Sequence, residues 1–477
     1  MQADVLVIGG GVVGCAIARQ LSARETRVVL VEAHEDVSMG ASKANSAIVH
    51  AGYDTKPGSM MAALNVRGNA MYDAWCQALE VPLARIGSLV IAFGPEEEET
   101  LLRLLEQGQA NGVPDLAIIS GEEARKLEPM LSQDVTAALY AKTGAITCPY
   151  QFTVACYENA VHNGAQALMN APVHGIERMA EGFRVQCGTY TVEARYIVNA
   201  AGMFADDIAR MVGDDSFHLS ARKGEYMLLD HTANTLSRVI FQTPTKMGKG
   251  VLVSPTVDDN AYAGPNACDL EDREDIQTTA EGLAGIAKLS LKSVPSLNIR
   301  AVITSFAGLR AQPSTGDFII EQSSAAPCMI HAAGICSPGL SSAPAIADYV
   351  VELLETAGLS LPMKPGFDPC RPAIRRFTEM TREEQTQAIA GNPRYGRVIC
   401  RCETVTEAEI VEAVRRGARS LDAVKRRTRA GMGRCQGGFC APRVMEIISR
   451  EAGVPMTEIT KFGGDSKLLV GAIKEVL

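Results

Sequence analysis

The chain has 477 residues, of which 47% are apolar and 21% charged, and its formal net charge is −9. This acidic balance gives no reason to expect nucleic acid as a partner, and no apolar run reaches the length that spans a membrane. Thirteen cysteines in a chain that begins directly on a strand favour reduced thiols. We therefore expect a cytoplasmic protein, which could associate with a membrane only peripherally, through a partner.

The first predicted elements are a strand, a glycine turn and a helix. An apolar run at 4–8 meets Gly9, Gly11 and Gly14, and a helical pattern follows over 15–21. Gly9 permits a tight turn, Gly11 lets the backbone approach a pyrophosphate, and Gly14 lets the helix pack closely on the strand. The start of the helix also offers free N–H groups to phosphates. Together these features predict a dinucleotide site.

A second predicted strand, at 27–32, ends in an acidic residue. Glu32 lies 18 residues after Gly14, where a carboxylate holds a ribose hydroxyl in dinucleotide sites. The loop that follows, at 36–60, is rich in small residues, which suits a backbone pressed against a ligand.

Apolar periodicity predicts the later elements in chain order. Helices are expected at 59–80, 96–112, 270–296 and 343–357, with another from Ala205. Strands are expected at 88–93, 164–169, 182–187, 196–202 and 329–334, several times within 220–265, and on or beside 306–310. Prolines 362, 365, 369 and 372 indicate a linker, which we extend over 359–395.

Residues 1–358 resemble the FAD-dependent D-amino-acid-oxidase-like superfamily. The resemblance rests on the N-terminal glycines, the small-residue loop at 40–50, the strand ending at 199–202, and a last glycine-rich helix start near 334–339. It implies an α/β fold, in which a Rossmann-like FAD-binding domain (1–85, 148–215 and 325–358) carries an inserted α+β, mixed-sheet substrate domain (86–147 and 216–324). The implied FAD contacts, besides the first three glycines and Glu32, are Ser42, Asn45, Ser46, Val173, Ala201, Gly202, Gly334, Gly339 and Leu340.

Two relatives within this superfamily compete. The catalytic part looks most like L-2-hydroxyglutarate dehydrogenases, on the segments 49–53, 57–59, 111–114, 224–226, 264–267, 308–312 and 337–339. The overall plan also resembles the catalytic subunit of anaerobic glycerol-3-phosphate dehydrogenase. That family has an Arg and a Lys where this chain has Asp54 and about Cys336–Ser337. Because a phosphate dianion favours such cations, we expect a carboxylate substrate rather than a polyol phosphate.

Four cysteines near the C-terminus form two close pairs, Cys400 with Cys402 and Cys435 with Cys440. Four thiolates can hold zinc or an iron–sulfur cluster, and this spacing fits a zinc ribbon poorly. The segment 397–450 resembles the bacterioferritin-associated-ferredoxin-like [2Fe–2S] domain. The resemblance implies that residues 396–477 form a small helical domain in which these cysteines bind the cluster.

A basic run precedes the second cysteine pair. We expect its side chains to offset the negative charge of the cluster and ease its reduction. Its members are Lys425, Arg426, Arg427, Arg429 and Arg434.

A flavin accepts a hydride and can release electrons singly to an iron–sulfur centre. His50 is our candidate base for the hydroxyl proton, and Arg310 is our candidate clamp for a carboxylate. Candidate pocket residues are Tyr53, Lys223, Tyr226 and Asn266.

We thus expect an FAD-dependent dehydrogenase of a small L-2-hydroxy acid, which passes electrons through [2Fe–2S] to a protein partner. Three alternatives stay open. They are a glycerol-3-phosphate dehydrogenase subunit, an amino-acid or hydroxyproline dehydrogenase subunit, and a redox module without turnover.

Overall fold

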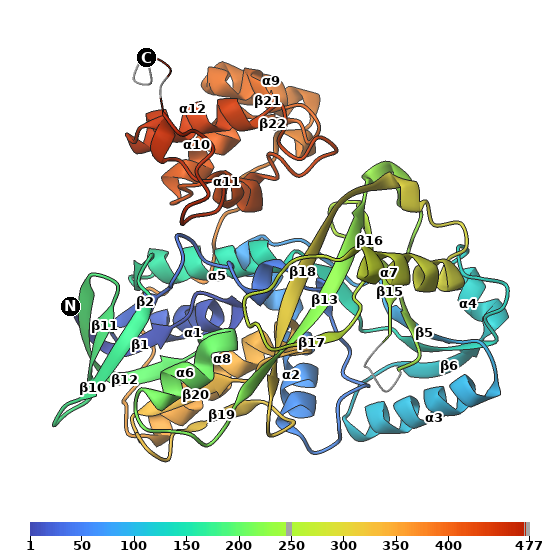
Figure 1. Ribbon diagram of the computed structural model, residues 1–477, viewed down its shortest axis with the longest axis horizontal. Coiled ribbons are helices and arrows are strands. Elements are labelled where there is room, and N and C mark those ends of the chain that lie inside the picture. Colours follow the sequence, from blue (N-terminus) through green and yellow to red (C-terminus); the bar gives the residue numbers. More distant parts are fainter. Residues whose placement is uncertain (245–249, 472, 474–477) are drawn as a thin grey trace.

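The computed structural model describes residues 1–244, 250–471 and 473 (Figure 1). Residues 245–249, 472 and 474–477, which fall in the expected strand region 220–265 and in the terminal domain, lie outside the described residues.

The flavin-binding region is built on a mostly parallel sheet, as the glycine fingerprint predicts. Its parallel strands run in the order β9 (Gln166–Leu168), β2 (Val28–Val31), β1 (Gln2–Ile8), β12 (Tyr190–Asn199) and β20 (Met329–Ala333). Antiparallel strands β10 (Val173–Arg178), β11 (Phe183–Cys187) and β19 (Ile319–Gln322) extend it.

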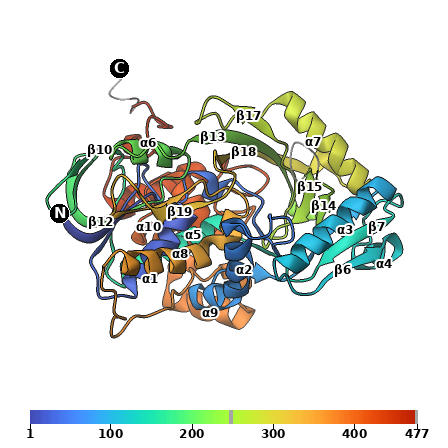
Figure 2. The same cartoon turned by 90° about the horizontal axis from the view of Figure 1, so that it is seen from below.

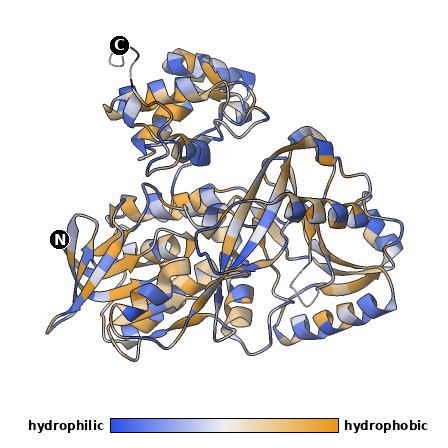
Figure 3. Ribbon diagram, viewed as in Figure 1, coloured by the Kyte–Doolittle hydropathy of each residue, from blue (hydrophilic) through white to orange (hydrophobic). Residues whose placement is uncertain are grey.

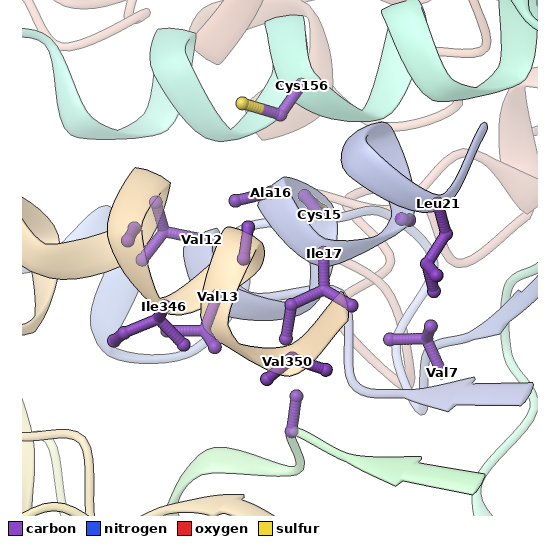
Figure 4. Packing of buried hydrophobic residues seen from close by; sticks show 14 of the residues in the cluster. Val7, Val12, Val13, Cys15, Ala16, Ile17, Leu21, Cys156, Ile346 and Val350 are labelled. Carbon is purple, nitrogen blue, oxygen red and sulfur yellow. The ribbon is translucent and has the colours of Figure 1, made fainter. Parts of the chain in front are cut away.

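The central strand β1 is buried on both faces, which explains its continuous apolar run. Val5 and Val7 join a core with helices α1 (Val12–Ser22), α2 (Met60–Leu79), α5 (Pro149–His162) and α8 (Gly339–Thr356). Figure 4 shows Val7 and Ile17 beside Val350 of α8. Leu6 and Ile8 face the opposite layer, which includes β11 and α6 (Ala205–Arg210).

A second sheet forms the region in which we expect the substrate to bind, here called the substrate region. Its order is β17 (Cys268–Leu270), β13 (Leu219–Leu229), β16 (Ala261–Gly264), β15 (Leu252–Pro255), β14 (Val239–Gln242), β5 (Ser88–Ala92), β7 (Ala137–Ala141) and β6 (Leu116–Ser120). The long strand β18 (Val302–Pro313) pairs with β13 along its whole length. In Figure 2, β13 and β18 lie between the flavin-binding region and the outer strands β6 and β7.

Helices α3 (Pro95–Ala110), α4 (Gly121–Leu127) and α7 (Ala280–Ser293) pack on this sheet. Figure 3 shows α3 largely in hydrophilic colours, in agreement with its partly exposed position. The expected helix 270–296 is shorter in the structure. Its first ten residues turn on the side chains of Asp272 and Asp275, and Thr279 caps the helix that follows.

The terminal domain contains helices α10 (Glu407–Arg415), α11 (Leu421–Thr428) and α12 (Ala441–Ala452) beside the short strands β21 (Val398–Cys400) and β22 (Val405–Thr406). The first part of the segment expected to be a linker lies along the flavin-binding region, where Arg371 N donates to Ala78 O at 2.9 Å. The second part forms helix α9 (Arg382–Gly391), because Thr381 and Glu384 build a capping box at its start.

Candidate functional site

The turn after β1 leaves no room for side chains. Gly9 has φ +110°, and a Cβ there would lie 2.3 Å from Ala200 O. A Cβ on Gly14 would lie 1.9 Å from Gly9 O. Gly11 is the N-cap of α1, and Val12 N donates to Ser42 Oγ at 2.8 Å. The backbone can therefore approach a pyrophosphate at the start of α1.

Glu32 is buried at the end of β2. Its Oε2 accepts from Gly10 N at 2.6 Å, and its Oε1 accepts from His34 N at 3.0 Å. A carboxylate offers about four acceptor sites, so these bonds orient the group and leave capacity for a ribose hydroxyl. The remaining acceptor capacity of the Glu32 carboxylate fits the ribose in the adenosine half of FAD.

Several of the other expected FAD contacts follow the carboxyl ends of parallel strands, where ligands bind in such sheets. Ala201 and Gly202 follow β12, and Gly334 follows β20. Gly339 and Leu340 open α8, while Val173 opens β10, close to the point where Ala171 N donates to Glu32 O. These positions come from segments that are up to 167 residues apart in the sequence, and those after β12 and β20 share one edge of the sheet.

The loop after Ser42 lies against the substrate sheet. Asn45 Nδ2 donates to Ala41 O, and its Oδ1 accepts from Ala47 N at 2.8 Å. A Cβ on Gly308 of β18 would lie 1.9 Å from Ala44 O, so only glycine permits this approach. The Tyr262 hydroxyl donates to Ser46 O. Asn45 and Ser46 thus sit between the sheet edge and strand β18.

The register of β13 and β18 defines one face of the substrate site. Arg222 lies opposite Arg310, and Tyr226 opposite Phe306, with the Tyr226 and Phe306 rings stacked at 4.7 Å. Directly opposite residues in antiparallel strands share a face. Burial raises the pKa of Tyr226, which the nearby Arg310 charge and the Ser46 hydroxyl partly oppose.

His50 is linked to this face through Phe241, which shares an apolar cluster with Tyr226 and Phe306. It is 7% exposed, its N–H donates to Ser341 Oγ at 2.7 Å, and its carbonyl accepts from Asn69 Nδ2 at 3.0 Å. Its ring centroid lies 5.8 Å from that of Phe241 on β14. Phe241 and Ser341, neither of them anticipated from the sequence, therefore contact this histidine, and Phe241 shares an apolar cluster with Tyr226 and Tyr262.

Three expected pocket residues have other contacts. Lys223 follows Arg222 on β13, so its side chain lies on the face opposite to that of Arg222 and Arg310. There its Nζ lies 2.7 Å from Asp275, and its side chain is 4% exposed. The Asn266 side chain accepts a hydrogen bond from Glu225 N. The backbone carbonyl of Asn266 accepts from Arg310 Nη2 at 3.3 Å. Tyr53 packs in the core beside α3, its hydroxyl bonded to Ser88. The structure does not bring the Lys223 and Tyr53 side chains to the site.

The four terminal cysteines form two pairs across the terminal domain. Cys402 Sγ lies 3.7 Å from Cys435 Sγ, and the Cys400 and Cys440 thiols lie near enough to shift each other's pKa. Two thiolates on one tetrahedral metal at about 2.3 Å are about 3.8 Å apart. Among the described residues, no three ligands of the His, Cys, Asp or Glu type converge on a single metal point. Two separate pairs suit a two-iron cluster, in which each iron takes two thiolates.

Backbone N–H groups point at these sulfurs. The pKa of the Cys400 thiol is lowered, chiefly by its bond with Cys440 and also by the N–H groups of Gly431 and Glu403. The Phe439 and Gly437 N–H groups lower the pKa of Cys435. A Cβ on Gly433 would lie 2.3 Å from Cys402 Cβ, so the loop can fold tightly around the pair.

The basic run differs from our expectation. Arg426 and Arg427 donate to Asp36 of the flavin-binding region at 2.7 Å, and both side chains are at most 5% exposed. Arg429 lies 2.8 Å from Asp258 of the substrate region and 2.7 Å from Glu403, while Arg434 bonds Asp230. Carboxylates at the domain junction thus pair with the four arginines, which the sequence did not predict, so less of their charge is left to offset that of the cluster than we expected.

Comparison with known proteins agrees with both sites. The family pattern described as "FAD dependent oxidoreductase" matches residues 4–353. The chain belongs to this family. A second pattern, "BFD-like [2Fe-2S] binding domain", matches residues 398–450. The predicted fold class and both predicted cofactors, FAD and [2Fe–2S], are thereby confirmed.

Individual relatives differ in the substrate that their names give. A glycerol 3-phosphate dehydrogenase of Caloramator mitchellensis is 49% identical over 99% of both chains. A solved L-alpha-glycerophosphate oxidase of Mycoplasma pneumoniae, with FAD bound, superposes with a TM-score of 0.74 at 33% identity, over 78% of this chain and 98% of its own. A mitochondrial L-2-hydroxyglutarate dehydrogenase of Arabidopsis thaliana is 27% identical over 73% of this chain and 82% of its own.

A search of the described helices for membrane spans finds none of sufficient length and hydrophobicity.

Proposed function

We propose that this protein is an FAD-dependent glycerol-3-phosphate dehydrogenase that passes electrons through its own [2Fe–2S] centre to a protein acceptor. The observation that carries the proposal is the 49% identity, over 99% of both chains, to a glycerol 3-phosphate dehydrogenase. That match spans the cluster domain as well as the flavin-binding region. The L-2-hydroxy acid that we expected from the motifs has weaker support, at 27% identity over 73% of the chain.

Positive charge in the pocket supports a phosphate substrate despite the missing cations at Asp54 and Cys336–Ser337. Arg222 and Arg310 occupy opposite register positions on one face of β13 and β18. Arg222 is half-buried and is paired with Asp269, whereas the described carboxylates form no ion pair with Arg310. A planar guanidinium binds a phosphate as well as a carboxylate bidentately, so Arg310 can clamp either group.

The residues of the site divide the work of oxidising a secondary alcohol. FAD, when bound, supplies an acceptor for the hydride that leaves the carbinol carbon. His50 takes the hydroxyl proton while the C–O single bond becomes the C=O double bond of a ketone. The product is dihydroxyacetone phosphate. Arg310 holds the phosphate and thereby orients the carbinol, while Tyr226, Tyr262 and Phe241 exclude water from the pocket.

The contact between the cluster loop and the flavin-binding region supports electron transfer within one chain. Thr147 N donates to Ala47 O at 3.0 Å, which joins β8 (Ala145–Thr147) to the flavin loop. Three residues later, the Tyr150 hydroxyl contacts Met432 Sδ at 3.5 Å. Met432 directly precedes Gly433, which packs against Cys402. The cluster domain thus rests beside α5, the helix that directly follows the strand bonded to the flavin loop.

A turnover assay under anaerobic conditions tests the substrate. Purified protein would be mixed with an artificial acceptor and either glycerol 3-phosphate, L-2-hydroxyglutarate or hydroxyproline. We expect acceptor reduction with glycerol 3-phosphate and a matching yield of dihydroxyacetone phosphate. Turnover with L-2-hydroxyglutarate alone would overturn the proposal and restore the carboxylate reading of Arg310.

A further inference from the structure

The loop that follows the ribose carboxylate is held by the terminal domain. Asp36 lies four residues after Glu32, and its carboxylate accepts from Arg426 Nη2 and from both Nη atoms of Arg427 at 2.7 to 2.9 Å. The side chains of all three residues are at most 5% exposed. The two arginines lie on α11, close to 390 residues further along the chain.

Neighbouring residues of the same loop make further contacts across this junction. Glu35 Oε2 accepts from the Thr460 hydroxyl at 3.1 Å, and the Glu35 side chain packs on Gly463. On its other side the loop is bonded to the glycine turn after β1, because Ser38 N donates to Gly10 O at 2.9 Å. One short loop therefore joins the terminal domain to the glycine turn of the FAD site.

A second segment of the FAD site lies within the electrostatic influence of the terminal domain. Lys43 follows Ser42, whose hydroxyl accepts from Val12 N at the start of α1. Burial lowers the pKa of Lys43, with the Arg426 charge as the next cause. The charged groups that influence this pKa come from both regions, Arg426 and Asp422 from α11, and Glu35 and Glu32 from the flavin-binding region.

We infer that the docked cluster domain also closes the adenosine half of the FAD site, with Asp36 as the positioning residue that joins the two. FAD can leave only when the loops at 35–38 and 41–43 open, and opening them separates Asp36 from Arg426 and Arg427. Separated buried charges are costly, so the ion pair slows this opening. The inference does not depend on which substrate the enzyme oxidises.

The test measures FAD release from the holoenzyme without any substrate. Asp36→Asn keeps the shape of the side chain but removes the charge that pairs with the two arginines. The rise in free-flavin fluorescence measures FAD release. We expect this release to be at least about tenfold faster than in the wild type. Iron content should stay unchanged, because the four cysteines lie elsewhere in the terminal domain.

Two further variants complete the design. Arg427→Gln breaks the same ion pair from the terminal domain, outside the FAD site, and should also accelerate release. Arg434→Ala is the matched control, because its pair with Asp230 also crosses the junction but the Arg434 side chain is 71% exposed. It should leave the release rate within about twofold of the wild type.

Limited proteolysis of the segment 359–381 reports whether the domain has undocked. Faster cleavage together with faster FAD release in both variants supports the inference. If only one of Asp36→Asn and Arg427→Gln folds, the same result in that variant supports it. Faster cleavage with an unchanged release rate would overturn it, because the domain would then have left without opening the FAD site. Unchanged cleavage and release in both variants would overturn it as well.

Discussion

The FAD site and the cluster site hold their cofactors in different ways. The FAD site is assembled from backbone and small residues at the ends of β1, β2, β12 and β20, spread from Gly9 to Leu340. The cluster site depends on four sulfur atoms within residues 400–440. A site shared among many backbone groups should tolerate the loss of one side chain, whereas a site of four ligands should not. The predictions below test this difference.

The largest expected effect is at a cluster ligand. Cys435→Ser replaces a thiolate that lies 3.7 Å from Cys402. A hydroxyl is a poor ligand for iron in such clusters, so we expect the iron content of the purified protein to fall to near zero. FAD content, measured from flavin absorbance, should stay close to one per chain.

The matched control is Cys370→Ser, since Cys370 is exposed and lies outside the cluster loop. It should change neither iron nor FAD. Full iron in Cys435→Ser would remove this cysteine from the ligand set.

At the substrate site, His50→Gln should slow the chemistry far more than binding. If His50 takes the hydroxyl proton, we expect flavin reduction by glycerol 3-phosphate to slow by about 10² to 10⁴-fold. Rapid mixing at several substrate concentrations separates the limiting rate from the apparent Kd. An unchanged limiting rate would exclude His50 as the base.

The sequence predicted the FAD-binding fold well because its information is local. Strand, glycines, helix and Glu32 follow one another within 32 residues, and each has a single structural role. The cysteine pairs are equally local. The pocket is harder, because a strand residue can face either side of the sheet. Lys223 and Arg310 both looked suitable, and only the register of β13 with β18 separates them.

The domain junction could not be predicted from the sequence. Arg426, Arg427 and Arg429 form an evident basic run, but their partners Asp36 and Asp258 are ordinary acids far away in the chain. Spacing carries no information about such pairs. A cue was present nonetheless, since Arg427 follows Ala423 and Val424 at helical spacing, and a charge on that apolar side of a helix requires a buried partner.

A smaller effect is expected at the glycine turn. Gly14→Ala places a Cβ 1.9 Å from Gly9 O, so the turn and α1 must shift. We expect a loss of about 1–3 kcal/mol in the free energy of unfolding and weaker FAD binding, while iron is retained. Denaturant titration and FAD titration of the apoprotein measure the two effects.

Gly40→Ala is the control, because a Cβ there meets no atom within 4 Å. Equal FAD affinity in both variants would contradict the assigned role of Gly14.

The smallest effect concerns acid stability at the junction. The arginines overcome the burial of Asp36 and lower its pKa from 3.8 to about 2. The stabilisation is therefore fully present above pH 5 and is lost as the pH falls toward 2, by about 2 kcal/mol in all. The difference in unfolding free energy between the wild type and Asp36→Asn should shrink over this range. A constant difference would show that Asp36 is not paired in the folded protein.

The central claim, a relay from flavin to cluster within one chain, is tested most directly by anaerobic reductive titration with glycerol 3-phosphate. Absorbance follows the flavin, and electron paramagnetic resonance follows the reduced cluster. We expect the wild type to take up about three electrons per chain, two at the flavin and one at the cluster, and Cys435→Ser to take up about two. A flavin that stays oxidised, or a cluster that stays oxidised beside a fully reduced flavin, would contradict the account.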